Sequence, residues 1–203
     1  MLHPDTELRF VSNAIGVGVF ATKLIPKGAI TWVHCALDQT FTPAAVAGLS
    51  PLHKRVMDKY SFVDGRGNHV LCWDHGRFVN HSCEPTCLSP GMAFEIAVRD
   101  IHPGQEVTDD YGSLNLDTPF HCLCGSPHCR GQIMPDDPVR LTRMWDEQIN
   151  EAILLVRRVH QPMWELMRET DREVLGDIVA GRVPVPSSVS NYAKQHMPMR
   201  QAV

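Results

Sequence analysis

The sequence predicts a mainly β fold that is followed by a helical C-terminal extension. Two observations predict it. Between residues 8 and 109, short apolar or alternating segments are separated by turns that contain glycine and proline. After Gly131, apolar residues recur instead at three- and four-residue steps. With 203 residues, of which 43% are hydrophobic and 21% charged, the chain is large and apolar enough to bury a core.

The β part is predicted element by element. Residues 8–35 contain strands on both sides of the turn Pro26-Lys27-Gly28, and residues 42–59 form a helix that is broken at 48–51. A hairpin follows, with strands at 60–63 and 68–71 around a turn at 64–67. Two further strands are predicted at 92–99 and 106–109.

The extension is predicted to hold two helices. Asp137 caps the first with its carboxylate, Pro138 lies in the first turn, and the apolar steps continue to Val159. The second helix covers 161–180 and ends at Gly181 and Pro184. Its apolar stripe is interpreted as core packing and consists of Met163, Trp164 and Met167. The residues from Pro184 onward are expected to be loose.

Composition narrows the class of protein. A formal charge of −4 argues against direct nucleic-acid binding and is compatible with a basic partner. No apolar run has the length of a membrane helix, and the N-terminus shows no secretory signal. Seven cysteines, an odd number, argue against a disulfide framework. We therefore expect a reducing, cytoplasmic setting and no membrane contact.

Residues 77–83, Arg-Phe-Val-Asn-His-Ser-Cys, place an amide, an imidazole, a hydroxyl and a thiol in succession behind two apolar residues. The Asn80 amide can donate and accept together, which suits a purine edge. His81 can orient a turn or donate a hydrogen bond, and Cys83 offers a sulfur ligand for a metal. Further on, Cys122, Cys124 and Cys129 form a C-x-C-x4-C pattern that favours a metal over disulfides.

Four stretches together resemble the SET-domain protein lysine methyltransferases. Residues 77–85 resemble that family's R-F-x-N-H-S-C-x-P signature, and residues 104–112 its G-E-E-L-T-[FY]-D-Y-G element. Residues 15–28 are similar to its glycine-containing opening, and residues 122–131 to its cysteine-rich post-SET tail. The resemblance covers residues 8–131 and suits a small stand-alone, bacterial-type enzyme.

The resemblance implies a fold and a domain order. The expected fold is a β-clip of small sheets with a pseudoknot, in which the segment around Asn80 passes through a loop closed near Tyr111. The SET domain would cover 8–115, the zinc-binding post-SET segment 116–132 and the helical extension 133–203. A homodimer through the C-terminal helices is one arrangement that such an extension allows.

The resemblance also implies a reaction, the transfer of a methyl group from S-adenosylmethionine to a protein lysine. Tyr111 is the leading catalytic candidate, as a hydrogen-bonding phenol and not as a strong base, and Tyr60 is a second one on the channel wall. The expected cofactor contacts are Gly16, Val17, Gly18, Asn80, His81, Tyr111 and Phe120. The expected substrate is a protein with an accessible lysine, such as a basic histone.

A structural Zn²⁺ needs four ligands, and the tail supplies only three sulfurs. The resemblance names Cys83 as the fourth. His121 and His128 are alternative ligands, and Cys87 is a rival to Cys83. Cys35 and Cys72 are interpreted as ordinary core residues.

Asp109 departs from the family pattern, which has Phe or Tyr there at the position that governs the number of methyl groups. An aspartate could hold a water, pair with the substrate ammonium or point away. It also leaves a rival hypothesis open, that of a catalytically weak SET domain that serves as a protein-binding module.

Overall fold

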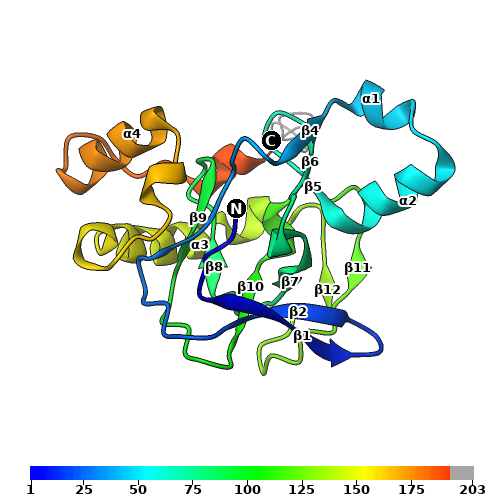
Figure 1. Ribbon diagram of the computed structural model, residues 1–203, viewed down its shortest axis with the longest axis horizontal. Helices are drawn as coiled ribbons and strands as arrows, with labels where there is room; N and C mark the ends of the chain where they lie inside the picture. The colour runs from blue at the N-terminus through cyan, green and yellow to red at the C-terminus, as the bar shows by residue number, and fades with distance from the viewer. Residues whose placement is uncertain (193–203) are drawn as a thin grey trace, which may run out of the picture.

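The strands of the computed structural model, which describes residues 1–192, form four small sheets (Figure 1). The largest sheet has the order β1-β2-β10-β7. Its strands are β1 (Thr6–Ser12), β2 (Gly16–Ala21), β10 (Glu106–Asp109) and β7 (Asn80–His81). β10 pairs antiparallel with β2 and parallel with β7. Segments from both ends of the β part therefore meet in one sheet.

Three further sheets surround this one. They consist of β3 (Ile30–Val33), β9 (Phe94–Ala97) and β8 (Cys87–Leu88), then β4 (Gln39–Phe41), β6 (His69–Leu71) and β5 (Ser61–Val63), and finally β11 (Phe120–His121) with β12 (Gln132–Ile133). The predicted strands and the β5–β6 hairpin are confirmed. The prediction of a mainly β fold with helices towards its C-terminus is also confirmed.

The broken helix before the hairpin consists of α1 (Pro43–Ala47) and α2 (Pro51–Tyr60). Thr42 and Ser50 cap them by accepting hydrogen bonds from backbone N–H groups, and a proline follows each cap. Tyr60 is the last residue of α2, so its expected place at the start of a strand is wrong. The 3₁₀ turn η1 (His75–Phe78) then leads directly into β7.

The C-terminal helices differ from the prediction in length. α3 (Asp137–Ile153) stops before the 3₁₀ turn η3 (Val156–Arg158) instead of reaching Val159. The second predicted helix is divided into η4 (Trp164–Leu166) and α4 (Glu169–Val179). Asp136, not Asp137, is the N-cap of α3.

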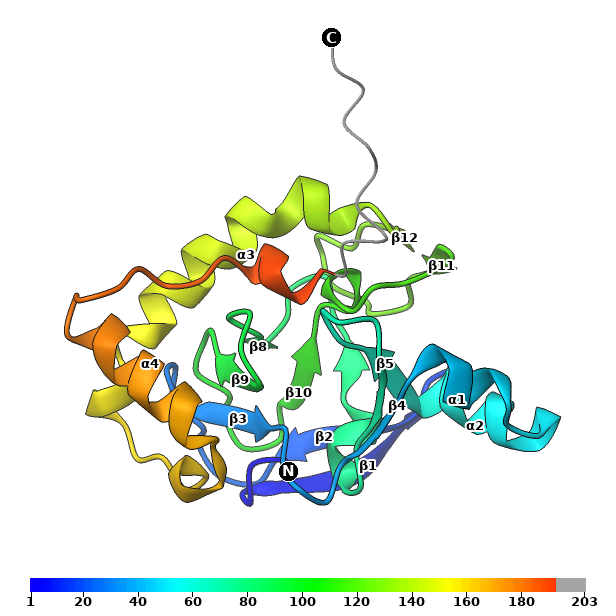
Figure 2. The ribbon, with the colours of Figure 1, turned by 90° about the horizontal axis from the view of Figure 1, so that it is seen from above.

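α3 and α4 lie on one side of the sheets, whereas α1 and α2 project from the opposite side (Figure 2). Trp145, Ile149 and Leu175 are fully buried in one cluster with Phe94 and Ile96 of β9. Met163 and Met167 are buried and Trp164 packs against the same cluster, which confirms the core interpretation of that stripe. The extension thus shares a core with the β part.

The segment after Pro184 is packed as far as it is described. Ser187 Oγ donates to Asp146 of α3 at 2.7 Å, and Tyr192 donates to the Pro135 carbonyl at 3.1 Å. The expectation that these residues are loose is therefore wrong up to residue 192, and the rest of it falls outside the described residues. Among residues 1–192, no helix is long and apolar enough to cross a membrane.

Candidate functional site

The two polar motifs meet side by side although about 30 residues separate them. In the parallel β7–β10 pair, Asn80 lies opposite Thr108 and His81 opposite Asp109. The Tyr111 hydroxyl donates to the Val79 carbonyl at 2.6 Å, and the Tyr111 backbone N–H donates to His81 Nδ1 at 3.1 Å. Tyr111 is thus held beside Asn80 and His81, as the resemblance implies. The threading of one segment through the other stays a prediction.

The predicted catalytic residues line one cavity of about 530 Å³. Tyr60, Asp109, Tyr111 and Phe120 all contribute to its wall. The Tyr60 ring meets Phe78 edge to face, with ring centroids 5.5 Å apart. Burial raises the pKa of Tyr111 above its usual value, and nearby carboxylates raise it further. The Tyr111 phenol is therefore a hydrogen-bond donor at neutral pH and not a base.

Gly18 lies where its missing side chain leaves room beside two polar groups. A Cβ atom at Gly18 would lie 2.1 Å from Glu106 Oε1 and 2.7 Å from Asn80 Nδ2. Asn80 Nδ2 donates to Glu106 Oε1 at 2.7 Å and to the Val17 carbonyl at 3.1 Å. Gly16, with a φ of 92°, turns the chain into this strand in a conformation that favours glycine. Gly16 and Gly18 thus lie beside a polar cradle, which is formed by the side chains of Asn80 and Glu106 and by the Val17 carbonyl. This agrees with the expectation that the backbone at these glycines approaches a ligand closely.

Three predicted cofactor contacts form an aromatic group next to this cradle. His81, Tyr111 and Phe120 have pairwise ring-centroid distances of 5.6 to 6.1 Å. Phe120 belongs to β11, just before the cysteine tail. Ring faces of this kind suit a flat heterocycle.

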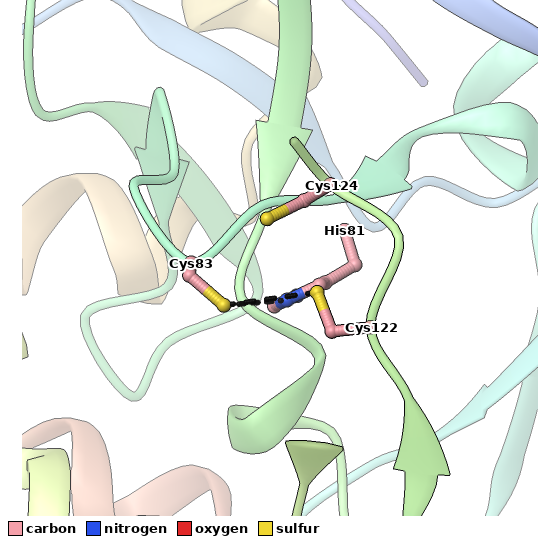
Figure 3. Close-up of side chains that lie close together, drawn as sticks. All are labelled: His81, Cys83, Cys122 and Cys124. Atoms are coloured by element: carbon pink, nitrogen blue, oxygen red, sulfur yellow. Dashed lines mark hydrogen bonds between the residues drawn. The ribbon is translucent and has the colours of Figure 1, made fainter. Parts of the chain in front are cut away.

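Sulfur atoms from two distant segments gather beside the aromatic group (Figure 3). The side chains of His81, Cys83, Cys122 and Cys124 place their potential ligand atoms within 4.8 Å of one another. Cys83 Sγ lies 3.7 Å from Cys122 Sγ. Cys129 lies outside that set of atoms but packs against Cys83 and Cys122, and its Sγ accepts the Gly131 N–H at 3.4 Å. Close, mutually facing cysteine sulfurs are a donor set that fits zinc.

Hydrogen bonds indicate the role of His81 in this cluster. Its Nδ1 accepts the Tyr111 N–H, so the proton of the neutral imidazole is on Nε2. Nε2 lies 3.4 Å from Cys83 Sγ and therefore donates to that sulfur (Figure 3). A protonated Nε2 cannot bind a metal, so in this tautomer His81 is a hydrogen-bond donor beside the sulfur atoms and not a ligand. The predicted role of Cys129 as the fourth ligand stays a prediction.

The other candidate ligands lie elsewhere. His128 Nδ1 faces Glu84 Oε1 at 3.1 Å, and the His121 side chain is exposed. Cys87 is fully buried and its thiol donates to the Thr108 carbonyl at 3.1 Å. Cys72 is buried in the core, as expected, whereas Cys35 is half-buried.

A buried ion pair fastens the cysteine tail to the second motif. Arg130 contacts Asp110 through both Nη atoms, at 2.7 and 2.6 Å. Asp110 is completely buried and also accepts from Trp145 Nε1 of α3 at 3.1 Å. Asp137 faces Arg130 at 3.5 Å and accepts from the Met134 N–H, which explains why it does not cap α3. The motif, the tail and α3 therefore meet at one carboxylate.

Asp109 is buried and lies in the cavity wall together with Glu95 of β9. The two carboxyl groups are within hydrogen-bonding reach of each other. Burial raises the pKa of Glu95 to about 7. Burial, and then the charges of Glu95 and Asp110, raise the pKa of Asp109 well above its usual range. The aspartate at the unusual position is therefore half of a carboxyl pair.

The sequence predicted neither Glu95 nor Glu106 as a site residue, and it gave Arg130 no role. Glu95 lies in a strand without a motif, so no local pattern could have singled it out. Glu106 and Arg130 do lie within recognised motifs, but only the spatial pairing reveals their partners.

Comparison with known proteins identifies the central part of the chain. Residues 16–112 match the SET domain family. The histone-lysine N-methyltransferase ASHH2 of Arabidopsis thaliana is 38% identical over 112 residues, which cover 47% of this chain and 6% of ASHH2. The H3 lysine-4-specific histone-lysine N-methyltransferase of Schizosaccharomyces pombe is 41% identical over 64 residues, which cover 28% and 7%. The chain thus spans less than a tenth of the length of these relatives.

Among solved structures, the methyltransferase domain of human histone-lysine N-methyltransferase SETMAR is similar over 66% of this chain and 58% of its own. Its TM-score is 0.44 and its sequence identity 18%.

Proposed function

We propose that the protein, whose residues 16–112 match the SET domain family, transfers a methyl group from S-adenosylmethionine to a lysine side chain of a protein substrate. One observation carries this proposal. Asn80, His81 and Tyr111, which come from two motifs, lie side by side, and Tyr111 also lines a cavity whose wall includes Tyr60 and Phe120. Such a cavity suits a reaction in which two reactants must be aligned.

The polar cradle and the aromatic group fit the methyl donor. The Val17 carbonyl and the Glu106 carboxylate are acceptors that suit an ammonium group, and Asn80 can donate or accept beside them. His81, Tyr111 and Phe120 offer ring faces for a purine. When bound, S-adenosylmethionine supplies an electrophilic methyl carbon on a sulfonium group. The residues of the chain hold the two ends of the donor and orient the incoming amine.

In this proposal Tyr111 is the catalytic residue that orients the reacting groups. Its hydroxyl is fixed by the Val79 carbonyl and stays protonated. Tyr60 forms part of the wall that excludes water around the amine. The proposed substrates are proteins with an accessible lysine, since the relatives are named for histone lysines. A basic substrate would also suit the net charge of −4.

We further propose a structural zinc ion held by Cys83, Cys122, Cys124 and Cys129, with His81 Nε2 as a hydrogen-bond donor to the Cys83 thiolate. Bound there, zinc would fasten the cysteine tail, and Phe120 with it, against the segment that carries Asn80. Metal binding would then be part of the assembly of the site.

Methyl transfer tests the proposal directly. Radiolabelled S-adenosylmethionine is incubated with core histones and with a protein extract, and mass spectrometry locates the label. We expect label on lysine, and we expect Tyr111→Phe to lower kcat by about 10²-fold because the amine loses its orientation. Donor binding without label on any substrate would favour a protein-binding module. Absence of donor binding in calorimetry would favour a zinc-containing interaction module.

A substitution in the cradle should separate donor binding from folding. Gly18→Ala is expected to weaken S-adenosylmethionine binding by about tenfold or more, since the new methyl group displaces Glu106 and Asn80. Gly48→Ala is the control, because no heavy atom lies closer than 3.5 Å to a Cβ there. Isothermal titration calorimetry measures both. Equal affinities for the two variants would place the donor elsewhere.

A further inference from the structure

Glu95 and Asp109 form a carboxyl pair that has no part in holding the donor or in orienting the amine. We propose that Glu95 accepts the proton of the substrate lysine ammonium and that Asp109 holds Glu95 in place for this step. The inference rests on the proposed function and adds a general base to it. The amine must be neutral before it can attack a methyl carbon. A free lysine has a pKa of about 10.4 and is therefore protonated at neutral pH, so a group must remove its proton.

Strand pairing directs Glu95 into the cavity. Glu95 of β9 lies directly opposite Trp32 of β3, so the two side chains share one face of that sheet. Both line the same cavity as Tyr111. The carboxylate of Glu95 and the phenol of Tyr111 therefore belong to the wall of one cavity.

An unused donor in the same wall points to a ligand. Trp32 is only 8% exposed, and its indole N–H has no hydrogen-bond partner within residues 1–192. The N–H lies next to Gly76, where a Cβ atom would be 3.2 Å from Nε1, and Gly76 also lines the cavity. A buried donor of this kind calls for an acceptor from outside the chain. A peptide carbonyl and an ammonium on one molecule would satisfy Trp32 and Glu95 together, as a lysine within a polypeptide does.

Asp109 is placed to support Glu95. Its Oδ1 accepts the Asp110 backbone N–H at 2.7 Å. Its carboxyl group hydrogen-bonds to Glu95 and, when protonated, donates to the Glu95 carboxylate. Two carboxyl groups this close keep one proton between them at neutral pH. Glu95 is thus the member of the pair that ionises first.

The groups around Glu95 come from several elements. Asp109 of β10 hydrogen-bonds to it, the thiol of Cys87 of β8 lies beside it, and the N-terminal ammonium attracts it electrostatically. Cys72 and Tyr111 also interact with its charge. Burial dominates these effects and brings the pKa of Glu95 to about 7, which suits a base that works near neutral pH.

The proton transfer balances without a further reactant. One N–H bond of the ammonium breaks, its electron pair stays on nitrogen, and an O–H bond forms on Glu95. The neutral amine then attacks the methyl carbon, the C–S bond breaks, and sulfur keeps that electron pair as a neutral thioether. Glu95 later releases its proton to water. Methyl transfer leaves the product nitrogen positively charged, so the next methylation needs another deprotonation.

The pH dependence of methyl transfer tests the base. With radiolabelled S-adenosylmethionine and core histones at saturation, kcat of the wild type should rise through pH 7 and then level off. Glu95→Gln should lower kcat at pH 7.5 by about 10²-fold. Its rate should keep rising tenfold per pH unit towards the pKa of lysine, about 10.4, because solvent then removes the proton. A variant damaged only in structure would not recover at high pH.

Two further variants and a control sharpen the result. Asp109→Leu removes the donor to Glu95 and should move the pH of half-maximal kcat upward by about one unit, whereas Asp109→Asn keeps a donor and should leave it near the wild-type value. Glu173→Gln removes an exposed carboxylate of α4 that does not line the cavity and should keep the wild-type profile. A Glu95→Gln profile parallel to that of the wild type, or an effect on KM alone, would overturn the base. A wild type without any transfer would overturn the proposed function as well.

A second readout needs no activity. Glu95 binds its proton more tightly in the folded chain, with a pKa of about 7, than in the unfolded chain, where its ordinary value is 4.5. The folded state therefore loses stability as the pH rises through this window. The urea midpoint of the wild type should fall between pH 5 and pH 8 relative to that of Glu95→Gln. Parallel midpoints would show that Glu95 is not desolvated in the cavity and would overturn the inference.

Discussion

Removal of zinc is expected to abolish S-adenosylmethionine binding and to lower the melting temperature by about 10 °C, because a structural metal contributes directly to folding free energy. The cysteine sulfurs come from the segment just after β7 and from the tail, so the ion would link these two segments. Without it, Phe120 would no longer be held against His81 and Tyr111. Chelation followed by calorimetry and thermal unfolding measures both effects, and limited proteolysis should show cleavage in residues 116–132.

Substitutions can distinguish the ligands from their neighbours. Cys122→Ser should reduce the bound zinc, measured by elemental analysis, from one ion per chain to much less than one. Cys35→Ser is the matched control, since that half-buried thiol lies outside the cluster. His81→Ala should retain zinc if its imidazole only donates to Cys83. A purified wild type without zinc, or a Cys122→Ser variant with the full amount, would contradict the proposed site.

Replacement of Arg130 by methionine is expected to lower the free energy of unfolding by about 3–5 kcal/mol. Methionine keeps much of the side-chain volume but removes both hydrogen bonds to Asp110. Asp110 is completely buried, so its charge would be left without its cationic partner. The loss should also loosen Tyr111, which follows Asp110 directly in the chain. Urea denaturation measures the stability, and donor affinity reports on the site.

An exposed arginine gives the matched control for this effect. Arg143 pairs with Glu147 at 3.0 Å on the surface of α3, with 92% of its side chain exposed. Arg143→Met should change the free energy of unfolding by less than about 0.5 kcal/mol, because water and salt screen exposed ion pairs. If the two substitutions destabilise equally, the buried pair does not fasten the tail.

Much of the fold follows from local rules. Alternation of apolar residues located β2 and β9, and the predicted break at 48–51 separates α1 from α2. In the helical C-terminal extension, these local rules fail to locate the end of a helix. The apolar steps predicted one helix up to Val159, but the chain leaves the helix after Ile153. Periodicity records which residues are buried and not whether the backbone between them stays helical.

The site shows the same division. The sequence by itself provided the reactive residues, because these depend on residue type and short spacing: the asparagine, histidine and tyrosine of the two motifs, the cysteine pattern and the match of residues 16–112 to the SET domain family. Only the tertiary structure decided the pairs: Asp110 with Arg130, Glu95 with Asp109, and Cys83 with Cys122. Each pair joins segments that are 14 to 39 residues apart, and only packing in three dimensions brings such segments together. Burial in turn gives Glu95 a pKa near neutrality, which no reading of its neighbours in the chain could supply.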